Sequence, residues 1–388
     1  MKLTFDNTEI AFAHRSNVEL SKAYWLFKLV GNPALVKLGK VLTRFALTLR
    51  LPIGWALRWN IFQHFCGGET ISDCATATKV LDRYGIGTIL DYSVEGKESE
   101  ADFDATADEI VRTVEIAHGN AHIPFCVFKV TGVARFALLE KINANKALSP
   151  AEQAEFDRVK LRVDRIAKRA HETGTPAFID AEESWIQDAI DRLCHELMER
   201  YNRERAIVYN TVQLYRHDRL DFLTKAIATA REKGYHYGVK LVRGAYMEKE
   251  RARAVEHCYA DPIQPNKAAT DRDFDAAVAL CLSNIDQVAF CAGTHNETSS
   301  LSLAKLIEEG RLSANDPRVY FAQLYGMSDH ISFNLSHAGY NVAKYVPYGP
   351  IREVIPYLIR RAEENTSVKG QTGRELSLIM RERKRRKA

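Results

Sequence analysis

The segment NVAKYVPYGPIREVIPYLIRRAEEN, residues 341–365, places a strand, a tight turn and a helix directly after one another. Val342 and Val346 favour a strand, because β-branched and aromatic side chains are enriched in strands. Gly349 and Pro350 predict a turn, with the proline at the first position of a helix. The apolar residues that follow recur at helical spacing, so the segment predicts one complete strand-turn-helix unit.

Two adjacent arginines, Arg360 and Arg361, lie near the end of this predicted helix, and Glu364 lies one turn beyond Arg360. An arginine pair beside an aromatic strand end can bind a small carboxylate through paired N–H donors. A solvated helix face is the alternative, and for a charged stretch considered alone it is the commoner outcome. The other strand ends of the chain must decide between the two interpretations.

Seven further runs of β-branched and aromatic residues precede this unit and alternate with amphipathic stretches. The runs cover residues 88–94, 123–130, 176–182, 206–214, 237–246, 286–294 and 318–324. Apolar residues at helical spacing predict helices at 103–118, 185–201, 219–233, 271–283, 299–310 and 329–338. Apolar strands that alternate with helices indicate an α/β protein with a parallel sheet covered on its faces. Eight such units favour a closed (βα)8 TIM-type barrel, and an open doubly wound sheet is the alternative.

The connection at 131–175 is longer than the others and predicts extra helices over the barrel rim. One helix is expected at 136–143, and a second begins where Ser149, Pro150 and Glu152 form a capping-box pattern.

Composition and the absence of internal repeats favour one main domain. We expect an N-terminal helical arm at 1–66, a barrel at 67–370 and a basic tail at 371–388. The basic run near the C-terminus is typical of a disordered solubilising tail. The segment 22–65 predicts amphipathic helices that pack on the core, with a membrane surface as the weaker alternative.

The composition excludes several classes of protein. With 46% hydrophobic and 27% charged residues, the chain has the balance of a globular protein. A net charge of +4 gives no indication of a nucleic-acid partner. Seven cysteines without a CxxC pair indicate reduced thiols and a cytoplasmic location. No secretory signal, membrane span, dinucleotide fingerprint or metal-ligand spacing is recognisable in the sequence.

Polar residues end nearly every predicted strand. In barrels of this type the active site lies at the C-terminal ends of the strands. The residues found there are Asp91 or Glu95, Lys129, Asp180 with Glu182, Gln213, Arg243 to Tyr246, Thr294 to Asn296, Leu324 to Met327, and Tyr345. Each of them alone could have a structural role, but as a set they indicate an active-site mouth. Lys129 and Lys240 interrupt apolar runs, where a lysine needs a partner or an anionic ligand.

Six ordered blocks resemble the proline dehydrogenase family, the flavin-dependent enzymes of proline catabolism, over about residues 65–365. The blocks are Phe128-Lys-Val130, Asp180-Ala-Glu182, KLVRGAY at 240–246, Thr294-His-Asn296, Leu324-Tyr-Gly-Met327, and Tyr345 with Gly349 and the Arg360-Arg361-x-x-Glu364 helix. The resemblance implies a distorted (βα)8 barrel that holds FAD non-covalently. It also implies oxidation of L-proline to Δ1-pyrroline-5-carboxylate by hydride transfer from C5 to flavin N5, with a quinone as electron acceptor.

The resemblance also assigns roles to individual residues. Lys129, Arg360 and Arg361 would bind the proline carboxylate, and Tyr246, Leu324 and Tyr345 would pack against the ring. Asp180 and Lys240 would act at the flavin, with Lys240 near N5 where the family often has arginine. The other FAD contacts would be Ala181, Gln213, Val242, Arg243, Gly244, Ala245, Lys267, Thr294, His295, Asn296 and Glu364. Met247 replaces an aromatic residue of some relatives, which puts the adenine-side contacts in doubt.

Two rival functions remain open. In the family a small residue in place of Tyr345 accompanies hydroxyproline as substrate, so a tyrosine favours proline. A barrel that has lost its flavin and only binds a ligand is the other alternative, and the intact carboxylate-binding set argues against it. Transfer of electrons to a quinone would suit a peripheral contact with the inner face of a membrane, through the N-terminal arm or the basic tail. The length of the chain predicts a single-function enzyme.

Overall fold

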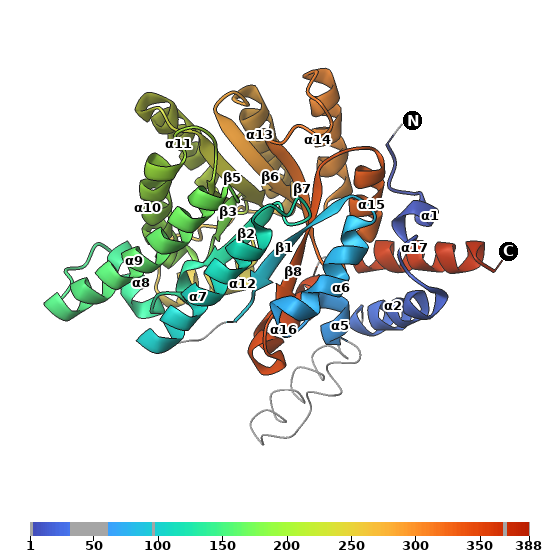
Figure 1. The fold of residues 1–388 in the computed structure, drawn as a ribbon, viewed down its shortest axis with the longest axis horizontal. Coiled ribbons are helices and arrows are strands. Elements are labelled where there is room, and N and C mark those ends of the chain that lie inside the picture. Colours follow the sequence, from blue (N-terminus) through green and yellow to red (C-terminus); the bar gives the residue numbers. More distant parts are fainter. Residues whose placement is uncertain (1–2, 32–60, 95–97, 368–370, 388) are drawn as a thin grey trace. The chain divides into compact units, whose positions relative to one another are not determined.

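Eight parallel strands form a closed barrel in sequence order from β1 to β8 (Figure 1). The computed structural model describes residues 3–31, 61–94, 98–367 and 371–387, without the side chains of residues 30 and 362–372. The strands are β1 (Ile86–Tyr92), β2 (Phe125–Lys129), β3 (Ala177–Asp180), β4 (Val208–Gln213), β5 (Tyr237–Val242), β6 (Val288–Gly293), β7 (Val319–Leu324) and β8 (Val342–Tyr348). All eight predicted strands are confirmed, and so is the (βα)8 barrel; the open sheet is wrong.

Helices connect the strands, as the alternating pattern predicts, and further helices precede β1 and follow β8. They are α1 (Thr8–Ala11), α2 (Asn17–Val30), α5 (Gln63–Phe65), α6 (Ile71–Asp82), α7 (Glu100–Ala117), α8 (Phe136–Asn143), α9 (Pro150–Thr173), α10 (Ser184–Tyr201), α11 (Arg219–Lys233), α12 (Met247–Glu256), α13 (Lys267–Ser283), α14 (Glu297–Glu309), α15 (Asp329–His337), α16 (Ile351–Ser367) and α17 (Gln371–Arg385), with a 3-10 turn η2 at Val130–Gly132. None of the described helices has the length and apolar composition that crossing a bilayer requires.

The chain divides into two compact units. The first unit consists of Met1–Glu95 and Gln323–Ala388, and the second of Gly96–Ala322. In the first unit β1 pairs with β8, so that Ile89 lies opposite Tyr345. In the second unit β2 to β7 pair in order, with Lys129 opposite Asp180 at the ends of β2 and β3.

The long insertion of the second unit forms α8 and α9, as the sequence predicts. The capping box is present: Ser149 accepts from the Glu152 N–H, and the Glu152 side chain accepts from the Ser149 N–H. Buried Arg162 of α9 then bonds to Glu100 and Asp104 of α7. The insertion is therefore fixed to its own unit by a buried cation and not only by apolar contacts.

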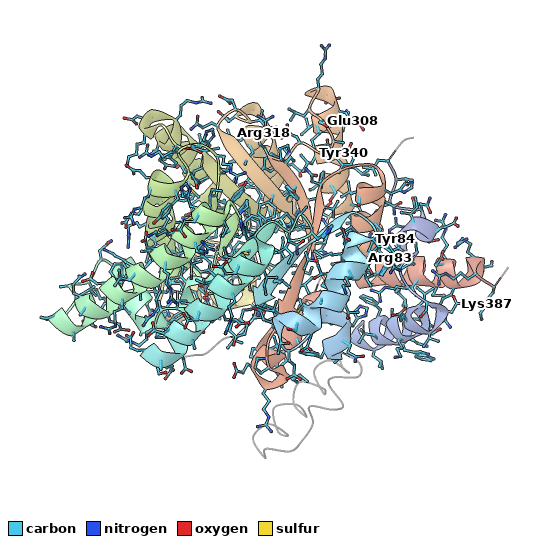
Figure 2. The ribbon with its side chains drawn as sticks, in the orientation of Figure 1. Arg83, Tyr84, Glu308, Arg318, Tyr340 and Lys387 are labelled. Carbon is cyan, nitrogen blue, oxygen red and sulfur yellow. The ribbon has the colours of Figure 1, made fainter. Side chains whose placement is uncertain are left out.

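The C-terminal segment is helical, so the expectation of a disordered tail is wrong. Leu378 and Ile379 of α17 are each 1% exposed and pack in a cluster with Leu20 and Phe27 of α2. The apolar residues of α17 lie just before the basic run and partly within it. The charge of this run therefore masked the helix in the sequence. Figure 2 labels Lys387, which lies beyond the end of this helix. The predicted helices of segment 22–65 lie mostly outside the described residues, which include only α2 and the region around α5.

Candidate active site

Charged side chains from three strands of the second unit meet at one carboxylate. Lys129 ends β2 and Asp180 ends β3, while Lys240 comes from the middle of β5. Lys129 Nζ donates to Asp180 Oδ2 at 3.0 Å, and Lys240 Nζ pairs with Asp180 Oδ1. The structure thus supplies the partner that the two lysines, placed among apolar residues, require.

Asp180 is ionised across the physiological pH range. Burial by itself would raise its pKa, but attraction to Lys240 and Lys129 and their hydrogen bonds lower the pKa to about 2. Lys240 is only 5% exposed, and its Nζ lies 5.4 Å from the centre of the Phe178 ring. Two ammonium groups around one carboxylate leave an excess of positive charge, which suits an anionic or electron-rich ligand.

Glu182 connects the end of β3 to the backbone that follows β2. It is 4% exposed, and its carboxylate accepts hydrogen bonds from the Thr131 N–H at 3.1 Å and from the Thr131 hydroxyl. Burial raises the pKa of Glu182 to about 7, although the bonds from Thr131 act against this shift. Thr131 lies two residues after Lys129, so Glu182 fixes the backbone that carries this lysine. The sequence identified Glu182 as a strand-end residue but not this role.

Gln213 brings a buried amide to the end of β4. It is 2% exposed, and its Oε1 has no hydrogen-bond partner among the described residues. An unsatisfied buried acceptor is costly, so this atom is suited to receive an N–H donor from a ligand. Gln213 pairs in register with half-buried Val242, and buried Ala181 directly follows Asp180.

Arg243 gathers several predicted cofactor residues of the second unit. Its guanidinium donates to Asp271 at 2.7 Å, to the Thr294 hydroxyl at 2.7 Å and to the Ser299 hydroxyl at 2.9 Å. Asp271 also pairs with Lys267 at the start of α13. The predicted residues Arg243, Thr294 and Lys267 are therefore brought together, and sequence reasoning missed Asp271 and Ser299, which hold them.

The residues after β5 form an exposed turn that leads into α12. Gly244 has φ +131°, and a Cβ at this position would lie 2.5 Å from the Tyr215 ring, so the backbone requires glycine. Ala245 is exposed, and half-buried Tyr246 is the N-cap residue of α12. Sequence reasoning missed α12. Its Glu250 side chain accepts from the Ser184 N–H and hydroxyl at 2.7 and 2.6 Å.

Two predicted cofactor residues at the end of β6 are half-buried. His295 precedes Asn296, whose Oδ1 accepts from the Ser299 N–H at 3.1 Å and thereby caps α14. The Asn296 N–H donates to the Thr294 hydroxyl at 3.1 Å. Asn296 therefore orders the turn that presents Thr294 and His295.

The remaining predicted residues belong to the first unit. Tyr345 is 8% exposed, and Leu324 packs against a core cluster of this unit. Arg361 is also 8% exposed, with its guanidinium carbon 5.3 Å from the centre of the Tyr357 ring, whereas Arg360 is half-buried. A fully solvated helix face is therefore wrong for this arginine pair.

Three further predicted positions are Asp91, Glu95 and Glu364. Asp91 is 5% exposed and accepts from the Ser93 hydroxyl at 2.6 Å. Glu95 and the side chain of Glu364 lie outside the described residues.

A family model described as proline dehydrogenase matches residues 74–374. This chain belongs to the proline dehydrogenase family. It is thus an oxidoreductase of a family that acts in proline catabolism, and the resemblance found in the sequence blocks is confirmed.

Three curated relatives are similar over most of the chain. The carbapenem antibiotics biosynthesis protein CarD of Pectobacterium carotovorum subsp. carotovorum is 35% identical over 323 residues, which are 83% of this chain and 83% of CarD. Mitochondrial proline dehydrogenase 1 of Dictyostelium discoideum is 32% identical over 384 residues, covering 88% of this chain and 67% of the relative. Hydroxyproline dehydrogenase of Xenopus laevis is 30% identical over 412 residues, covering 97% of this chain and 88% of the relative.

Among solved structures, proline utilization A (PutA) from Bdellovibrio bacteriovorus inactivated by N-propargylglycine is similar with a TM-score of 0.72 and 18% identity. The match covers 93% of this chain and 38% of that protein. This chain therefore spans well under half the length of PutA, and the likeness supports the barrel fold alone.

The raised pKa of Glu182 predicts a pH-dependent stability. Between the ordinary glutamate pKa of 4.5 and about 7, the folded protein binds more protons than the unfolded chain. The free energy of unfolding should therefore fall as the pH rises through this window, by roughly 3 kcal/mol at most. In Glu182→Gln, denaturant unfolding measured across this range should lack this slope. The exposed control Glu309→Gln should retain it, and equal slopes in the Glu182 variant and the wild type would contradict the prediction.

Proposed function

We propose that this family member binds FAD non-covalently and oxidises L-proline. The bound FAD would supply the redox chemistry by accepting a hydride from C5 of proline at N5, giving Δ1-pyrroline-5-carboxylate and electrons for a quinone. The observation that carries the proposal is the Lys129–Asp180–Lys240 cluster, formed by β2, β3 and β5 of a chain that the proline dehydrogenase model matches.

The second unit has groups that fit a flavin. Gln213 Oε1 is a buried acceptor with no partner among the described residues, and it would receive an N–H of the isoalloxazine. Lys240 would place its positive charge near N5, and Asp180 would keep this ammonium oriented. A cation there stabilises the negative charge that a flavin gains on reduction.

Residues farther along the strand ends would hold the rest of FAD. Arg243 is kept in place by Asp271, Thr294 and Ser299, so it could meet an anionic phosphate with little loss of side-chain entropy. The remaining contacts of this proposal are Ala181, Val242, Gly244, Ala245, Lys267, Thr294, His295, Asn296 and Glu364.

Three cations would bind the carboxylate of proline. Arg360 and Arg361 would do so through charge-assisted hydrogen bonds, and Lys129 would add an ammonium that Asp180 holds in position. Tyr246, Leu324 and Tyr345 would pack against the ring. Fixing the carboxylate and the ring together restricts the orientation of C5, and such orientation supplies much of the rate of a reaction between two bound groups.

Hydroxyproline is the second candidate substrate, because the Xenopus laevis relative is a hydroxyproline dehydrogenase. Tyr345 favours proline, since a bulky side chain beside the ring leaves little space for a hydroxyl. The kcat/KM values of the two substrates distinguish these candidates, and a higher value for hydroxyproline would overturn the choice of proline.

A membrane contact belongs to the proposal because the electron acceptor would be a quinone. The first unit exposes Trp25 and Leu29 on α2, at 57% and 53%, and basic residues on α17. Apolar side chains beside cations suit an anionic bilayer surface. Failure of the protein to sediment with quinone-containing anionic liposomes would remove this part of the proposal.

The first prediction from this function concerns colour. Purified protein should show the visible absorbance of an oxidised flavin, and anaerobic proline should bleach it, because the hydride reduces the isoalloxazine. Stopped-flow or steady-state measurements of the flavin absorbance test this expectation. A colourless protein that added FAD cannot reconstitute would favour a barrel that only binds a ligand.

A second prediction concerns Arg361. Arg361→Met should raise the KM for proline by about ten- to a hundredfold while the flavin stays bound, because a charge-assisted hydrogen bond contributes roughly 1.5–3 kcal/mol. Steady-state kinetics together with flavin content provide the measurement. Arg352→Met is the matched control, because Arg352 is an exposed arginine of the same helix, α16. An unchanged KM in Arg361→Met would refute the carboxylate assignment.

A further inference from the structure

A buried lysine in β8 holds the loop between β7 and α15 in the first unit. Lys344 is 0% exposed, and its Nζ donates to the Leu324 carbonyl at 3.3 Å, to Asp329 Oδ1 at 2.9 Å and to the Met327 carbonyl. These three acceptors match the three N–H donors of an ammonium group. They belong to the last residue of β7, to the loop itself and to the first residue of α15, so one side chain contacts both ends of the connection and a residue within it.

The backbone of this loop needs such support. Gly326 has φ +76° and Ser328 has φ +52°, both in the left-handed region that a serine adopts at some cost. The Gly326 carbonyl lies 2.8 Å from His64 Nε2, and the Ser328 N–H donates to Glu375 at 2.6 Å. The loop conformation is therefore determined by its contacts and not by local preference.

The charge of Lys344 is balanced inside the same unit. Arg15 donates twice to Asp329 Oδ2, at 2.7 and 3.2 Å, so Asp329 lies between two cations. Burial alone would raise the pKa of Asp329, but Lys344 and Arg15 hold it well below the ordinary range. His14 also belongs to this cluster, and its ring stacks on that of Phe333 with 4.1 Å between the ring centres. Figure 2 labels Tyr84, whose ring lies 6.2 Å from that of His14.

The loop also connects Leu324 to Tyr345, the two residues of this unit that would pack against the substrate ring in the proposed function. The Tyr325 N–H donates to the Tyr345 carbonyl at 2.8 Å, which ties the residue after Leu324 to the residue after Lys344. Side chains alternate along a strand, so Lys344 and Tyr345 point to opposite faces of β8. Lys344 therefore holds Leu324 from one face while Tyr345 is presented on the other.

We propose that Lys344 is a positioning residue that sets the spacing between Leu324 and Tyr345, and through it the selectivity for the substrate ring. The inference rests on the proposed function, in which these two residues pack against that ring. Lys344 itself does not touch the substrate. Without its ammonium group, the carbonyls of Leu324 and Met327 lose their donor, the loop relaxes, and space for a ring substituent opens between the two walls.

The experiment compares Lys344→Met with the wild type. Methionine keeps most of the side-chain volume but has no N–H donor. We expect the ratio of kcat/KM for proline over hydroxyproline to fall by about tenfold, through a higher KM for proline, with flavin content and kcat changed less. A carboxylate analogue of proline should also give a smaller ligand-induced rise in unfolding temperature. Lys344→Arg retains the donors and should recover part of the ratio.

Two further variants separate positioning from general destabilisation. Glu382→Gln changes a 0% exposed carboxylate of α17 in the first unit, which pairs with Arg385 at the end of this helix and with Arg386 directly after it. It should lower the unfolding temperature and leave the selectivity ratio unchanged. Where Lys344→Met does not fold, Arg15→Met leaves Lys344 in place, loosens Asp329 and should change the ratio in the same direction by a smaller factor.

The outcomes are distinct. An unchanged ratio in folded Lys344→Met, or a change equal to that of Glu382→Gln, would overturn the positioning role while the proposed function stands. Wild-type protein that holds no flavin and oxidises neither substrate would overturn the proposed function, and the inference with it.

Discussion

The cost of placing charge away from water governs both parts of this protein. A buried lysine is tolerated only where a carboxylate or several carbonyls satisfy it. In the second unit Asp180 serves Lys129 and Lys240, and in the first unit Asp329 serves Lys344 and Arg15. In each unit a carboxylate thus lies between two cations, close to residues that the family resemblance assigns to the site. The ion pairs with Asp180 and Asp329 hold the long side chains of these lysines and of Arg15 in place, so that apolar packing is not needed to hold them there.

The sequence was sufficient for the fold and for part of the site because the relevant signals are local. Each strand is a short apolar run, and each connecting helix repeats its apolar residues at helical spacing, so neither depends on distant residues. Lys129 and Lys240 could be singled out because they interrupt such runs, and the need for a partner followed from desolvation alone. The structure then identified Asp180 as the partner.

What the sequence did not reveal depends on pairings between distant residues. Lys344 interrupts an apolar run as Lys129 and Lys240 do, but the run does not show its partners, because its cluster includes Arg15, which is 314 positions from Asp329. Glu182 was visible at a strand end, but its bonds to Thr131 cross 51 positions. The burial of α17 depends likewise on α2, at the opposite end of the chain. No periodicity or spacing within a short window contains these contacts.

Lysine at position 240 is compatible with the way Asp180 is shared. Lys240 pairs with Oδ1 and Lys129 with Oδ2, so each oxygen has one cation. The family resemblance implies that arginine is common at this position, and an arginine would present a planar fork that matches both oxygens of one carboxylate. Such a fork would compete with Lys129 for Oδ2 unless the carboxylate turned. A point charge at 240 leaves the second oxygen to Lys129 and so keeps at the end of β2 the cation that the proposed function assigns to the substrate carboxylate.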